Sequence, residues 1–193
     1  CIRDRGRGPT ETYGGVISRI GSIVSRLVYD AILEGVKKVG YDPGRPMIKR
    51  LEERGISIDD IVDTALQLFV DKDRLGLSKS SKLIRSSILE ALKDVNVACI
   101  VDAALRLDED SRLGLIPGLD PQRYQYDPVD LVAAEILAIT LALYLNGWNA
   151  LFELYRYDTK KPGILSRLPP FLDDIIAAVI AGVTSRVYSR CHP

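Results

Sequence analysis

Apolar residues recur at steps of three and four along most of this chain, and no segment alternates apolar and polar residues. Near the start, Ile17, Ile20, Val24, Leu27 and Ala31 form one stripe of this kind. Such spacing is typical of amphipathic helices, whereas half-buried strands repeat every second residue. The sequence therefore predicts an all-α fold. Turn and capping signals divide it into helices over about 15–39, 45–54, 58–69, 78–92, 95–107, 129–145, 148–157 and 171–189.

The segment from Leu131 to Leu145 is strongly apolar and is interrupted only by Glu135 and Thr140. It is short for a membrane span and carries an acid in its first half. We therefore expect a buried core helix there. The overall expectation is a compact bundle of six to eight helices around this buried apolar helix.

The composition excludes several classes of function. The 193 residues carry equal numbers of basic and acidic side chains, which gives no reason to expect nucleic-acid binding. The one histidine, His192, excludes a histidine-based triad or a His-rich zinc site. Three scattered cysteines favour a reducing, cytoplasmic location. The high share of charged residues resembles that of a thermophile's protein.

Four carboxylates lie beside strongly apolar segments and are candidates for chemistry. Each has an ordinary alternative. Glu135 could form a structural ion pair with an arginine or lie at a partly exposed helix edge, and Asp158 could lie in a solvated turn. Asp173 and Asp174 could complement the dipole of the last helix. Together they could supply oxygen ligands to Mg²⁺, which prefers carboxylates and water. Nearby cations could hold phosphate oxygens, and the candidates are Arg156 and Lys161.

These residues resemble a known signature. Asp158-x-x-Lys161-Pro162, followed by Leu172-Asp173-Asp174-Ile175-Ile176-Ala177, is similar to the motif of the phosphatidylglycerophosphatase A family. In that family an Asp-Glu pair lies upstream on an apolar helix. Here the pair reads Ala134-Glu135. If the missing acid binds metal in that family, either Asp127 or Asp130 substitutes for it or the site has fewer ligands.

The resemblance is closer to the soluble branch of the family, which includes an archaeal α-ribazole phosphatase, and it extends from Leu51 to Arg186. It divides the chain into a basic N-terminal arm and helix over residues 1–50 and a helical domain over residues 51–193. It implies a compact all-α enzyme, a Mg²⁺-dependent phosphatase. The catalytic residues would be Glu135, Asp158, Lys161, Asp173 and Asp174, with the four acids as metal ligands.

Two substrates follow from the resemblance: phosphatidylglycerophosphate, a lipid, and α-ribazole phosphate, a precursor in cobalamin biosynthesis. The alternative is a non-catalytic helical interaction module that keeps the family fold. The N-terminal helix offers two partners. Its apolar spacing over residues 16–39 suits a homodimer, and its basic residues suit peripheral contact with an anionic membrane; these are Arg19, Arg26, Lys37 and Lys38.

Overall fold

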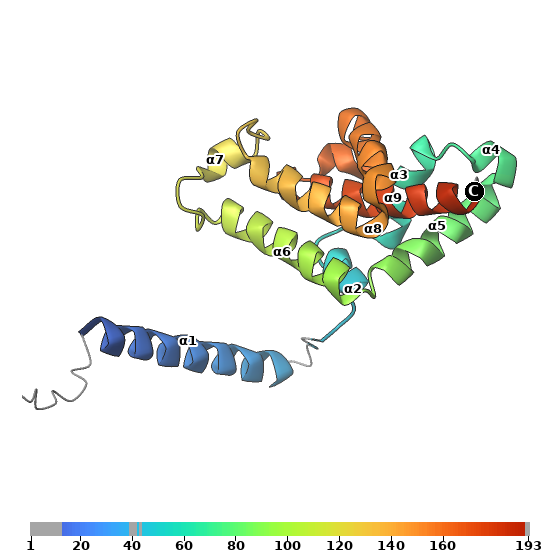
Figure 1. The fold of residues 1–193 in the computed structure, drawn as a ribbon. Coiled ribbons are helices and arrows are strands. Elements are labelled where there is room, and N and C mark those ends of the chain that lie inside the picture. Colours follow the sequence, from blue (N-terminus) through green and yellow to red (C-terminus); the bar gives the residue numbers. More distant parts are fainter. Residues whose placement is uncertain (1–12, 39–41, 43, 192–193) are drawn as a thin grey trace, which may run out of the picture. The chain divides into compact units, whose positions relative to one another are not determined.

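The computed structural model describes residues 13–38, 42 and 44–191, and it divides the chain into two units, Cys1–Arg45 and Pro46–Pro193. Every element in the described residues is helical, which confirms the all-α prediction. The helices shown in Figure 1 are α1 (Tyr13–Lys38), α2 (Met47–Glu52), α3 (Ile58–Leu68), α4 (Lys72–Leu75), α5 (Leu77–Ala91), α6 (Val95–Arg112), α7 (Pro121–Tyr124), α8 (Val132–Lys160) and α9 (Pro170–Cys191), with a 3-10 turn η1 (Gly163–Arg167).

The first unit contains α1, which covers the predicted helix with small shifts at both ends. The apolar side chains described on α1 are largely exposed, including Ile23, Val24 and Leu27. The arginine-rich arm before α1 lies outside the described residues, as does His192.

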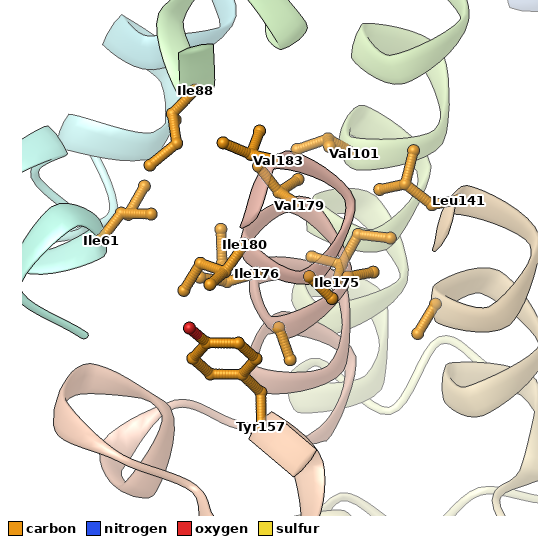
Figure 2. Packing of buried hydrophobic residues seen from close by; sticks show 14 of the residues in the cluster. Ile61, Ile88, Val101, Leu141, Tyr157, Ile175, Ile176, Val179, Ile180 and Val183 are labelled. Carbon is orange, nitrogen blue, oxygen red and sulfur yellow. The ribbon is translucent and has the colours of Figure 1, made fainter. Parts of the chain in front are cut away.

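The core of the second unit is built around α9. Every residue from Pro170 to Ser185 is buried, because isoleucine, valine and alanine occupy all sides of this helix. Figure 2 shows Ile176, Val179, Ile180 and their neighbours on α9 between side chains of α3 and α5 on one side and of α6 and α8 on the other. The central helix is therefore α9.

The segment that was expected to lie at the centre forms the first half of α8. It is only half buried. Val132, Ile136, Ile139 and Leu143 are exposed, while Ala134, Ala138 and Leu141 face the core. The prediction that this segment is a buried core helix is therefore wrong for its outward face. The sequence could not distinguish the buried face from the exposed face, because both faces of this helix carry apolar residues.

A kink divides α8. Asn146 and Gly147 leave the helical region, with φ values of −154° and 59°, at the point where the sequence predicted a helix end. Among the described residues, α8 alone is long and apolar enough to cross a membrane, a test that core helices of soluble proteins also pass. Its first half begins later than predicted, at Val132 and not near Pro128.

Local signals gave mixed results elsewhere. Ser57 caps α3 in a capping box with Asp60, as predicted. Ser78 does not cap the next helix, because α5 begins one residue earlier, after Gly76. The sixth helix continues to Arg112, and the single-turn helices α4 and α7 were not predicted.

Candidate functional site

The kink in α8 creates the site. The two halves of this helix and the start of α9 enclose a cavity of about 440 Å³. Its walls are mostly apolar, and they include Ile139, Leu151 and Phe152. Three carboxylates also line it: Glu135 from the first half of α8, Asp158 from the second half and Asp174 from α9. The structure thus brings three of the four predicted acids to one cavity.

The fourth acid, Asp173, lies next to this group in the first turn of α9. Its Oδ1 accepts a hydrogen bond of 2.9 Å from the backbone N–H of Asp174. The start of α9 is fixed by Tyr124, whose hydroxyl accepts from the N–H of Phe171 at 3.4 Å and donates to the buried Asp108 at 2.7 Å. This anchoring holds both aspartates at the edge of the core.

The carboxylates repel one another. Burial and, to a smaller extent, the charges of Asp173, Asp158 and Glu135 together raise the pKa of Asp174 to about 8, although Lys161 acts to lower it. Burial also raises the pKa of Asp173 to about 6, although Lys161 opposes the shift. A cation placed among these groups would relieve their repulsion.

Lys161 supplies one such cation at the end of α8. Its Nζ lies 2.5 Å from Asp173 Oδ2 and 3.0 Å from Asp127 Oδ2. Burial acts to lower the pKa of Lys161, but the two carboxylates outweigh it and raise that pKa above its usual value. Lys161 therefore stays charged and remains partly exposed beside the acids.

The backbone after Lys161 is held in an unusual conformation. Lys161 is left-handed, with φ 37°, and Gly163 follows with φ 56°. A Cβ on Gly163 would lie 2.3 Å from Thr64 Oγ1, and that hydroxyl accepts a 3.0 Å hydrogen bond from the N–H of Ile164. Close docking on α3 thus sets the direction in which the chain leaves Lys161.

Arg156, predicted to hold phosphate, has other partners. Its guanidinium donates to both carboxylate oxygens of Glu153, at 2.8 and 2.7 Å, and to the Leu68 carbonyl at 3.1 Å. Residues two apart on a helix do not share a face, and Arg156 does not line the cavity that Asp158 lines. The structure therefore does not bring Arg156 to the carboxylates.

The residue that departs from the family motif, Ala134, is buried on α8. Neither substitute named from the sequence lines the cavity. Asp127 pairs with Lys161, and Asp130 pairs with Arg123. The Asp127 contact was not expected, because it joins residues 34 positions apart that precede and follow α8. Glu153 was also missed, although a glutamate three residues before Arg156 was a readable signal for an ion pair.

The donor set fits a hard divalent cation in its chemistry, since it consists of carboxylate oxygens that repel one another. In the arrangement seen, no three His, Cys, Asp or Glu side chains of the described residues are close enough to share one metal ion. Binding would thus require side-chain rotation. Glu135 can turn freely because it is exposed.

Comparison with known proteins gives relatives without an assigned activity. No family model matches the chain. The uncharacterized protein MJ1330 of Methanocaldococcus jannaschii is 30% identical over 131 residues, which is 66% of this chain and 99% of the relative.

Solved structures share the fold. The low temperature requirement C protein from Listeria monocytogenes matches with a TM-score of 0.67 and 28% identity, over 76% of this chain and 95% of that one. Protein ypjQ from Bacillus subtilis matches with a TM-score of 0.65 and 22% identity, over 75% and 92%. The extent and identity of the archaeal match show that this chain belongs to the family of the uncharacterized protein MJ1330.

Proposed function

We infer that the protein is a Mg²⁺-dependent phosphatase that hydrolyses phosphomonoesters, of the phosphatidylglycerophosphatase A type. The observation that carries this proposal is the convergence of Glu135, Asp158 and Asp174 on one cavity, with Asp173 and Lys161 beside it. Three separate helical segments supply these acids, so the arrangement is not a by-product of one helix's own capping.

The proposed roles follow from the placement of the side chains. The four carboxylates would hold the cation, whose charge would offset their mutual repulsion. A bound Mg²⁺ would supply Lewis-acid polarisation of the phosphate and offset its charge. Lys161, held by Asp173 and Asp127, can donate to a phosphate oxygen through a free N–H of its ammonium group. The surrounding apolar side chains limit the access of water and strengthen these charge interactions.

The apolar wall of the cavity bears on the substrate. Ile139, Leu151 and Phe152 provide a surface for an apolar or aromatic group next to the phosphate position. The acyl chains of phosphatidylglycerophosphate and the aromatic base of α-ribazole phosphate are both groups of this kind. We therefore propose these two phosphomonoesters as substrates to be tested side by side.

The decisive assay is release of inorganic phosphate from the two substrates, with Mg²⁺ and with EDTA. We expect Mg²⁺-dependent release from at least one substrate and a loss of about 100-fold or more in Asp158→Asn and Asp173→Asn, as for groups acting in the transition state. Asp73→Asn, which changes an exposed acid on α4, serves as the matched control and should keep full activity. Absence of release from both substrates would oppose the proposal.

One observation favours a second candidate, a non-catalytic interaction module that keeps the family fold. In the described residues the carboxylates are not gathered into a metal-sized cluster, and Lys161 already neutralises Asp173. Calorimetric titration with Mg²⁺ separates the two ideas. Binding that disappears in Asp158→Asn supports the phosphatase, whereas no binding to the wild-type chain supports the module.

A further inference from the structure

The outward side of α8 carries a continuous group of exposed apolar side chains, which we call the α8 patch. In the first half of the helix, Val132, Ile136, Ile139 and Leu143 recur at steps of four, three and four, and are 38% to 57% exposed. In the second half, Trp148, Phe152 and Tyr155 are 70% to 73% exposed. Single exposed apolar residues are common, but a contiguous group of this size marks an interaction surface.

The patch is continuous with the mouth of the cavity, because Ile139, Phe152 and Tyr155 also line it. The hydroxyl of Thr140, on the same half of α8, does not need water as a partner, because it donates a 2.7 Å hydrogen bond to the Ile136 carbonyl. From Leu131 to Leu145 the charged side chain is Glu135, which turns toward the cavity. Glu135 lies within one helical turn of Val132 and Ile139, so a partner that covers the first half of the patch must leave the Glu135 carboxylate facing the cavity.

We propose that the α8 patch is the contact surface for a second copy of this chain, which pairs through α8 beside the mouth of the cavity.

The size and spacing of the patch favour a second copy. With typical side-chain areas, the exposed parts of these side chains amount to roughly 700 Å² of apolar surface per copy. A standard protein–protein interface buries ~800 Å² on each partner, which is close to this area. Steps of four, three and four form the seam that packs against a helix with the same spacing, and α8 of a second copy supplies one. A two-fold pair requires a single self-complementary surface.

The charge at the patch disfavours a lipid surface. The ionisable groups that line the adjoining cavity are Glu135, Asp158 and Asp174, all acidic. No lysine or arginine is among the described residues that line this cavity, whereas polybasic clusters are the usual means of attachment to an anionic membrane. We therefore treat vesicle binding as an alternative outcome of the test.

The test is the mass of the full chain by sedimentation velocity, across a wide range of protein concentration. The wild type should reach twice the mass of one chain. The Val132→Glu/Ile136→Glu double variant should remain a monomer, with its dimer dissociation constant raised about 100-fold or more, as expected for charges placed in the centre of an interface. Neither residue lines the cavity. Circular dichroism should show unchanged helicity.

Two matched variants make the result specific. Val95→Glu introduces the same charge at a 70% exposed apolar residue of α6 and should leave the dimer intact. Leu27→Glu does so on α1, where the sequence suggested a different dimer, and it should also leave the dimer intact. The proposal is overturned by a monomeric wild type, including one that binds anionic vesicles. A dimer that Leu27→Glu dissociates and the double variant does not would also overturn it.

Discussion

At the scale of single residues, the site is defined by charges that the fold holds at a cost. Asp174 is buried among three other carboxylates, and Lys161 contacts only one of those four acids directly. The sequence could indicate that these acids mattered, because Glu135 and Asp174 lie among apolar neighbours. It could not show that Arg156 turns to Glu153, since that choice depends on the Leu68 carbonyl, far away in the sequence.

The raised pKa of Asp174 gives a prediction about stability and pH. Its pKa is about 8 in the folded state, above the usual value near 3.8 for the unfolded chain. Below both values the carboxyl is protonated in both states and has no effect. As the pH rises from about 4 to 8, the unfolded state binds fewer protons than the folded state, so folding stability falls. Asp173, with a pKa of about 6, adds to this fall over a narrower range.

We therefore expect the melting temperature of the wild type in EDTA to fall between pH 5 and pH 8.5. Asp174→Asn should show a smaller fall and should melt a few degrees higher than the wild type at pH 8.5, because it removes a repelled charge. Asp73→Asn is the control for any general effect of net charge. If the melting temperatures of the wild type and Asp174→Asn changed equally with pH across this range, the pKa of Asp174 would not be raised in the folded state.

At the scale of helices, the order and type of the longer helices could be predicted, but their burial could not. The capping box at Ser57 and the break at Asn146 and Gly147 are local signals, and both are present in the structure. Choosing α9 over α8 as the centre required tertiary information, because both helices are apolar on more than one face. The informative difference is that α9 has no charged residue from Ile175 to Ser185, whereas α8 carries Glu135.

Close contact between α8 and α9 gives a second prediction. A Cβ on Gly182 would lie 2.4 to 2.9 Å from atoms of Leu145, just before the kink. Gly182→Ala should therefore destabilise the protein by about 1–3 kcal/mol, the usual cost of overpacking, measured by urea unfolding.

The double variant Gly182→Ala/Leu145→Ala should lose less stability than the sum of the two single variants, since the two residues share one space. Gly21→Ala, in α1, is the control and should not destabilise the protein, because a Cβ there would meet no atom of the described residues within 4 Å. Fully additive effects of Gly182→Ala and Leu145→Ala would contradict the steric explanation.

At the scale of the whole molecule, the compact helical unit from Pro46 to Pro193 presents one cavity at which several features meet. The kink of α8 opens the cavity, the buried α9 places two aspartates at its edge, and the α8 patch borders its mouth. The sequence predicted the acids but not the cavity. The cavity depends on how the two halves of α8 are placed by their packing on α9, which is a tertiary feature.

The most direct test of the central claim is a crystal structure of the protein grown with Mn²⁺, whose anomalous scattering locates the ion. We expect a peak at the cavity with oxygens of at least two of Glu135, Asp158, Asp173 and Asp174 about 2.0–2.3 Å away, as for Mg²⁺-like ligands. The same crystals of Asp158→Asn should lose the peak. A structure with millimolar Mn²⁺ and no ion at these carboxylates would contradict the account.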